Sequence, residues 1–351
     1  MALLTGLLAF CHGGMLQAAD CDALADQTIR WVVPSKPGGG YDAYSRLIQP
    51  FLERQLAARI VIENRPEAGG IVGAVAIRDA RKDGRTIGII NASGLLAAHL
   101  AGRNTVPDPS ADFTILARIV TNRMVLFTGQ NSGIPDIESL LRKSNETPIV
   151  VGVRDAGSAS FFAFPIAAQY LGLDYWMVTG YVGSTSRVLA VLRGEVDVIL
   201  QTLDSVMPYV NSGELLPLLW VTGAPEVGQQ ALSSPVPTLD DLERVVLAPV
   251  AMKSPAAASG QKIEADAVSA LMRAGRLVVA PSHLPAPVEA CLQSSVLAVL
   301  QSVDIQQTAS EADLTLEPAD AGAARADVEA SKQQMRPYVP LVRAAIDRAN
   351  Q

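Results

Sequence analysis

Short apolar runs alternate with segments of helical spacing along the first hundred residues. The runs predict buried strands at residues 29–33, 59–63 and 86–90, and the spacing predicts helices at 42–56, 71–80 and 94–101. Pro50 lies inside the first of these helices and predicts a kink there. Strands and helices that alternate at this spacing predict a parallel α/β layer.

A second α/β set follows a longer apolar run at residues 119–128. A helix is expected to open at Ile134-Pro135-Asp136, and the next elements are strands at 149–153, 175–178, 196–200 and 215–221, with helices at 158–171 and 185–193. Residues 233–260 are rich in Pro, Ser and Ala, and helical spacing then predominates, at 287–303 and 324–349. The pattern predicts two α/β lobes with helices returning at the C-terminus.

The first residues indicate export. Residues 1–10 are apolar and uncharged, and small residues follow, which predicts a signal peptide at 1–19 cleaved after Ala19. No Lys or Arg precedes the apolar run and Gln17 occupies a position that favours small residues, so a buried N-terminal helix is the alternative. Export would leave Cys21 and Cys291 in an oxidising compartment, either paired in a disulfide or as two unrelated thiols.

Composition narrows the possible partners. Lys and Arg number 28 against 35 Asp and Glu, a net charge of −7 without a basic cluster, so we expect no nucleic acid and no anionic membrane surface as partner. Three Cys without a C-x-x-C pair and three scattered His predict no metal site. After residue 20 no apolar stretch reaches the ~20 residues that span a bilayer.

Four loops rich in Gly and Ser connect predicted strands to helices. The strongest is PSKPGGGYDAYSR at residues 34–46, where Asp42 is the expected N-cap of the following helix; the others lie at 63–70, 155–160 and 180–185. Helix N-termini at the carboxyl ends of strands favour an anion, either phosphate or carboxylate. Ala43 replaces the third glycine of a dinucleotide fingerprint, although Glu63 stands near the expected acid, so that interpretation is secondary and no cofactor is expected.

These segments together resemble a known family. The runs VVPSKPGGGYDAYSR, VIENRPEAGG, KDGRT, GYVGSTSRVLAVLRGEVD and SPVPTLDDL resemble the tripartite tricarboxylate transporter receptor family, the extracytoplasmic solute-binding Bug proteins. The resemblance covers most of residues 29–241, with weaker support from 277 to 345. It implies a two-lobed, type II-like Venus-flytrap fold, with lobe 1 at 20–120 plus 224–351 and lobe 2 at 121–223. It also implies a periplasmic, monomeric receptor that passes a small organic acid to membrane permease subunits.

The resemblance implies a set of ligand-binding residues in both lobes. They are Ser35, Gly38, Gly39, Gly40, Tyr41 and Asp42 in the first loop, Glu67, Ala68, Gly69 and Gly70 in the second, and Gly157, Ser158, Ala159, Ser160, Tyr181, Gly183, Ser184, Asp204 and Ser205 in the second lobe.

Several residues depart from the family pattern and leave the solute open. Glu67 stands where a glycine is usual, and is either a solvated loop acid or a group that recognises an amine or hydroxyl. Tyr41 is either a ligand contact or a surface residue. Residues 161, 162 and 164 are phenylalanines that form either core or an apolar wall. Arg154 and Arg187 flank second-lobe loops and are candidates for pairing a second carboxylate.

Catalysis has little support in the sequence. His99 and His283 have no Ser and Asp arrangement around them that resembles a triad, and Ser158 is not in a nucleophile elbow. We therefore expect a binding protein and not an enzyme. A transport receptor is the first hypothesis, and a ligand-sensing receptor for a membrane signalling partner is the alternative. The sequence does not separate them, since in both the two lobes would close on the ligand.

Overall fold

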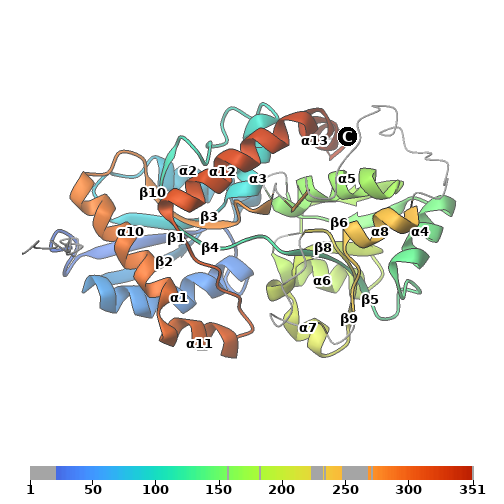
Figure 1. Ribbon diagram of the computed structural model, residues 1–351, viewed down its shortest axis with the longest axis horizontal. Helices are drawn as coiled ribbons and strands as arrows, with labels where there is room; N and C mark the ends of the chain where they lie inside the picture. Colours follow the sequence, from blue (N-terminus) through green and yellow to red (C-terminus); the bar gives the residue numbers. More distant parts are fainter. Residues whose placement is uncertain are drawn as a thin grey trace, which may run out of the picture.

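The computed structural model describes residues 21–155, 158–181, 183–222, 232, 235–246, 268–269 and 272–349. The chain forms two α/β lobes, each built on one mixed sheet (Figure 1). The expected signal peptide and Gly157 lie outside the described residues, as do most of residues 245–276, a segment whose sequence departs from the family pattern.

Lobe 1 is the part of the molecule built on a six-stranded sheet. In spatial order its strands are β11 (Ala319–Asp320), β4 (Phe113–Val120), β10 (Arg276–Pro281), β3 (Thr86–Asn91), β1 (Thr28–Val33) and β2 (Arg59–Asn64). β1 pairs in parallel with β2 and β3, whereas β10 runs antiparallel to β3 and β4. The parallel layer predicted for the first hundred residues is therefore confirmed in β1 to β3, and β10, a strand that the sequence did not predict, makes the complete sheet mixed.

Lobe 2 is the part built on a five-stranded sheet. In spatial order its strands are β7 (Tyr175–Val178), β6 (Ile149–Gly152), β8 (Val198–Thr202), β5 (Met124–Gly129) and β9 (Leu215–Trp220). β6 pairs in parallel with β7 and β8, and β5 is antiparallel to β8 and β9. The apolar run at 119–128 spans the end of β4 and most of β5, so the chain crosses between lobes at residues 121–123.

Helices cover both sheets. Those that follow lobe 1 strands are α1 (Gly40–Leu56), the 3-10 turn η1 (Glu67–Gly70), α2 (Ile71–Arg78), α3 (Ala92–Leu100), α10 (Ala286–Gln301), α11 (Val303–Glu311) and α12 (Ala321–Met335). Those that follow lobe 2 strands are α4 (Ile137–Glu146), α5 (Ala159–Leu171), α6 (Ser184–Leu192), the 3-10 turn η2 (Leu203–Ser205), α7 (Met207–Asn211) and α8 (Leu239–Val246). Pro50 and Pro165 lie inside α1 and α5, and neither ends its helix.

Two late elements reach the second lobe. An isolated β-bridge between Trp220 and Thr238 places the start of α8 beside β9 of lobe 2. The lobe boundaries expected from the sequence assign residues 224–351 to lobe 1. After the turn η4 (Arg336–Tyr338), helix α13 (Val339–Ala349) contacts α3 of lobe 1 and α5 of lobe 2 (Figure 1). The C-terminal helix therefore links the two lobes away from the strand connections.

In the described part of the chain the apolar core forms three clusters, one in each lobe and a third that includes residues of both. In lobe 1 it includes Trp31 and Tyr44, both fully buried between the sheet and α1. In lobe 2 Phe161, Phe162 and Phe164 are buried at the start of α5, where Phe161 and Phe162 meet edge to face at 5.1 Å between ring centroids. These phenylalanines are therefore core residues and do not form an apolar wall of the cavity described below.

A disulfide joins Cys21 to Cys291, with 5.4 Å between the two Cα atoms. It fastens the segment before β1 to the first half of α10, and it closes a loop with a sequence separation of 270 residues.

In the described part of the chain, no single helix has the length and apolar character to cross a membrane. Only α10 and α11 taken together meet that criterion, and they are separated by a bend of 57°.

Candidate functional site

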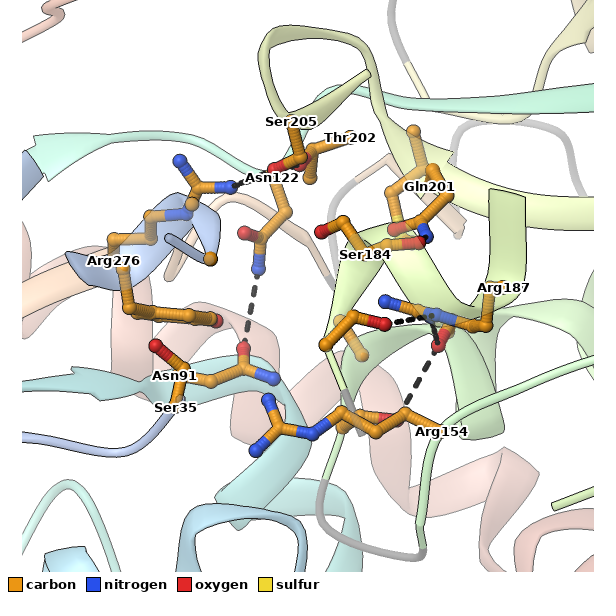
Figure 2. Close-up of a pocket in the computed structure, with 18 residues that line it drawn as sticks. Ser35, Asn91, Asn122, Arg154, Ser184, Arg187, Gln201, Thr202, Ser205 and Arg276 are labelled. Atoms are coloured by element: carbon orange, nitrogen blue, oxygen red, sulfur yellow. Dashed lines mark hydrogen bonds between the residues drawn. The ribbon is translucent and has the colours of Figure 1, made fainter. Parts of the chain in front are cut away.

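A cavity opens between the two lobes, at the carboxyl ends of the central strands. The space between the lobes at this place amounts to about 520 Å³, part of which is open to solvent. Figure 2 shows the polar side chains around it. Of the predicted site residues, ten line it: Ser35, Gly39, Gly40, Tyr41, Ser158, Ala159, Ser160, Gly183, Ser184 and Ser205. The strand-to-helix loops predicted after β1, β6 and β7 thus meet at one place.

The loop after β1 presents the N-terminus of α1 to the cavity. Ser35 is buried there, and its hydroxyl has no hydrogen-bond partner in the described part of the protein. Gly39 is the N-cap of α1 and supplies no side-chain cap. The first amides of the helix are therefore free of a side-chain acceptor from the cap position, an arrangement that favours an anion.

Asp42 does not line the cavity and is not the N-cap that the sequence predicts. It lies inside the first turn of α1, where its carboxylate accepts hydrogen bonds from the Gly38 amide at 2.9 Å, Arg46 Nε at 2.8 Å and Asn64 Nδ2 at 2.9 Å. Burial alone would raise the pKa of Asp42, but these hydrogen bonds outweigh it and hold the pKa below its usual value. Asp42 therefore stabilises the loop through hydrogen bonds on the side away from the cavity. Gly38 does not line the cavity either.

The loop after β2 contributes only its two glycines. Glu67 and Ala68 are exposed, and neither lines a cavity, so the carboxylate of Glu67 does not face the solute space. Gly69 and Gly70 line a smaller adjoining space beside Tyr41. Gly70 has φ +91°, and a Cβ on it would lie 2.6 Å from Cβ of Pro34, so only glycine fits there.

In lobe 2, the loops after β6 and β7 meet through hydroxyl groups. Ser158 caps α5, accepting a hydrogen bond from the Phe161 amide, and its Oγ lies 3.3 Å from Oγ of Ser160. Ser184 begins α6. Tyr181 lies outside the cavity lining, with its ring edge against the position of Gly152.

Arg154 and Arg187 both line the cavity, and both are buried. Arg154 donates from Nη2 to the carbonyl of Pro34 at 2.7 Å, and thus reaches from lobe 2 to the first loop of lobe 1. Arg187 donates from Nη1 to Ser160 Oγ at 3.0 Å and from Nε to the Gly183 carbonyl at 3.3 Å. Burial, assisted by repulsion from Arg154, lowers the pKa of Arg187 to about 9, so its guanidinium is charged at neutral pH.

Arg276, the first residue of β10, reaches from lobe 1 to lobe 2. It forms a buried ion pair with Asp204 and donates to Thr202 Oγ1 at 2.8 Å, while its guanidinium stacks 4.7 Å from the ring centroid of Tyr44 and 5.1 Å from that of Tyr41. Burial would raise the pKa of Asp204, but the charge of Arg276 and its hydrogen bonds lower it. Asp204 therefore neutralises Arg276 behind the cavity wall and does not line the cavity itself.

Sequence reasoning missed six of the lining residues. They are Asn91, Asn122, Met124, Gln201, Thr202 and Arg276. Asn91, Gln201 and Thr202 come at the ends of buried strands, which is a signal that the sequence offers. Arg276 is the first residue of β10, and Asn122 lies in the crossing between lobes, so neither belongs to a strand-to-helix loop.

In the described part of the chain, no three His, Cys, Asp or Glu side chains come together as a metal site.

A model of the family "Tripartite tricarboxylate transporter family receptor" matches residues 44–282. The chain belongs to this family. Curated relatives of this receptor include a UPF0065 protein from the tcbD–tcbE intergenic region of Pseudomonas sp. strain P51, 28% identical over 58% of this chain and 60% of the relative. Protein BugT of Bordetella pertussis is 24% identical over 58% of this chain and 63% of BugT. The receptor thus spans about three fifths of the length of the curated relatives that it matches.

Solved structures agree on the fold of this receptor. The periplasmic binding protein BugD superposes with a TM-score of 0.71 at 20% identity, over 91% of this chain and 97% of that one. MatC from Rhodopseudomonas palustris with bound malate gives 0.69 at 20% identity, over 90% and 99%. The R. palustris protein Rpa4515 with adipate gives 0.72 at 22% identity, over 90% and 97%. The expectation of a two-lobed binding-protein fold is confirmed.

Proposed function

We propose that this receptor binds a small carboxylate-bearing solute in the cavity between its lobes and delivers it to membrane permease subunits. The observation that supports this most is the charge of the cavity wall, because the part of its lining that the structure describes includes three buried arginines and no acidic residue. Serine hydroxyls and the N-termini of α1, α5 and α6 add hydrogen-bond donors from both lobes. Family membership supports delivery to a permease, and the relatives described with malate and adipate support a carboxylate.

We infer that the receptor works in the periplasm as a monomer and without a cofactor. The disulfide between Cys21 and Cys291 supports an oxidising compartment, since structural disulfides are rare in the cytosol. We expect no turnover, because among the described residues the lining includes hydroxyl groups but no His, Asp or Glu that would act as a base for them.

Native mass spectrometry of protein purified without added ligand tests this function. We expect a complex heavier than the chain by the mass of a small organic acid, which mild denaturation releases. Protein refolded from denaturant provides the empty control, and it should regain the mass shift and a higher melting temperature with acids from a panel. A protein that neither retains an acid nor is stabilised by any acid in the panel would contradict the proposal.

A further inference from the structure

We propose that Arg276 and Asp204 form a clasp between the two lobes, which holds the cavity closed through contacts of the protein with itself and so limits the rate at which the solute leaves. The effect on release rests on the proposed function, whereas the effect on closure concerns the empty protein as well. The inference is carried by the burial of the pair, by its hydrogen bonds and by the groups that hold each partner on its own lobe.

The clasp joins two charged side chains that belong to different lobes. Arg276 is the first residue of β10 in lobe 1, and Asp204 lies in η2 of lobe 2. Their side chains are 3% and 8% exposed, so the place where the lobes meet shields this ion pair from water. A buried pair is screened little by salt, and removing one partner leaves the other charge buried alone, which is costly. The pair therefore favours closure only while both charges are present.

The hydrogen bonds of the Arg276 guanidinium extend across to lobe 2. Nη1 donates to the carboxylate of Asp204, and Nη2 donates to Thr202 Oγ1 at 2.8 Å and to Ser205 Oγ at 3.3 Å. Figure 2 shows the guanidinium directed toward Thr202 and Ser205. These acceptors belong to the end of β8 and to η2, so the contacts need no solute to form.

Other groups hold each half of the clasp on its own lobe. On lobe 1 the guanidinium stacks on the rings of Tyr41 and Tyr44, which both belong to α1. On lobe 2 the hydroxyl groups of Thr202 and Ser205, on either side of Asp204, lie 2.7 Å apart and bond to each other. Because these contacts lie within one lobe, closure brings together groups that are already positioned and loses little side-chain freedom.

The clasp differs in its partners from the two other arginines of the cavity wall. Arg154 donates to the carbonyl of Pro34 and Arg187 donates to the hydroxyl of Ser160, so uncharged acceptors hold both. An anionic solute can pair with these two, whereas Asp204 already neutralises the charge of Arg276. Closure thus has an ion pair of its own, which the solute does not complete.

The clasp acts on release more than on capture. Capture takes place in the open form, where the pair is separated and both charges are hydrated. Release requires the lobes to part, and the pair must break before they do. Loss of the clasp therefore shortens the time that the solute stays bound, and it raises the open fraction of the empty protein that can capture solute.

Small-angle X-ray scattering of the refolded, solute-free protein tests closure directly. The wild type should have the smaller radius of gyration, and Asp204→Asn and Arg276→Gln should each have a larger one because an unpaired charge drives the lobes apart. The double variant buries no charge and should be more compact than either single variant. Arg193→Gln removes an exposed arginine beside the end of α6 and should scatter as the wild type does.

Stopped-flow measurement of association and release provides the second readout. The probes are succinate, glutarate and citrate. For each probe that binds, release from Asp204→Asn should be about tenfold faster or more than from the wild type, while association changes less than about threefold. Arg276→Lys keeps the charge without the planar fork and should give an intermediate release rate. Circular dichroism and melting temperature show that each variant is folded.

The outcomes separate the clasp from the proposed function. Single variants that are as compact as the wild type would overturn the clasp, and so would single variants that release the probes no faster. A double variant that is more open than both single variants would also overturn it, because the two charges would then act independently. Variants that open while no probe binds the wild type would support the clasp and count against the proposed function.

Discussion

Asp42 illustrates how a residue outside the cavity determines its form. Its carboxylate accepts from the Gly38 amide, Arg46 and Asn64, and so fixes the loop that presents Ser35 and Gly39. An Asn at this position would keep one acceptor oxygen but would turn an NH₂ group toward donors. The stabilising contacts are therefore specific to the ionised acid.

Asp42→Asn should lower the free energy of unfolding at pH 7 by about 1–3 kcal/mol. The pKa of Asp42 is lower in the folded state, so its stabilisation is present above the unfolded pKa of about 4 and is lost as pH falls through the folded pKa. The difference between wild type and variant should thus shrink in urea titrations at about pH 3. Asp304→Asn changes an exposed acid in the first turn of α11 and should cost less than about 1 kcal/mol at either pH.

Individual side chains were the least predictable level of this site. The sequence predicts that loops after strands bind a ligand, and among the residues so predicted Ser35, Ser160 and Ser184 line the cavity. The sequence does not show that Glu67 faces solvent, because the direction of its side chain depends on the backbone conformation of the loop. It also cannot find Arg276, since this residue lies at the start of an antiparallel strand and not in a loop between a strand and the helix that follows it.

At the scale of elements, the start of α1 is in close contact with η2 of the other lobe. A Cβ on Gly40 would lie 2.5 Å from Oγ of Ser205, so either this hydroxyl would leave its contacts with Thr202 and Arg276 or the lobes would move apart. Gly40 has no positive φ, so an alanine is compatible with the helix itself. We therefore expect the glycine to favour the close contact between the lobes more than the fold of lobe 1.

Gly40→Ala should weaken solute binding about tenfold or more while changing the melting temperature of the empty protein little, because the clash exists only when the lobes meet. Titration of the solute identified by mass spectrometry measures this. Adding Ser205→Ala removes the clashing oxygen and should restore much of the affinity relative to Gly40→Ala alone. Ser205→Ala by itself is the control, and a melting temperature that falls sharply in Gly40→Ala would point to damage within α1 instead.

Element types were predictable because their hydrophobic patterns are strong and local. The strands before residue 100 and the helix that Ser158 caps follow directly from apolar runs and capping residues. The apolar run at 119–128 was harder to interpret, because one stretch of sequence supplies strands to two sheets. Strand direction could not be derived either, since β5 and β10 enter their sheets by crossing from the other lobe.

At the scale of the whole molecule, the lobes are connected in several independent ways. The chain crosses at residues 121–123, α13 contacts α3 and α5, Arg276 pairs with Asp204, and Arg154 bonds to Pro34. The last two are side-chain contacts that separation of the lobes would break. Opening therefore changes the partners of the cavity arginines and leaves the covalent connections in place.

Replacing Cys21 and Cys291 by serine together should lower the free energy of unfolding by about 5 kcal/mol, because the disulfide closes a loop of 270 residues in the unfolded chain. Denaturant titration of the double variant measures the loss. Wild-type protein with a reductant should lose stability to a similar extent, whereas the reductant should not change the variant. Equal stability of the two proteins without reductant would show that the bond contributes nothing.

The arginines in the cavity also have a kinetic consequence. The chain bears a formal net charge of −7, so an anion far from the protein meets a repulsive field, while the cavity wall contributes the charges of Arg154 and Arg187 beside an Arg276 that Asp204 neutralises. The positive charges of the cavity attract anions to its opening, whereas the net negative charge of the protein repels them elsewhere. Encounter with the solute is thus guided over a range of about one Debye length, and added salt slows capture more than it hastens release.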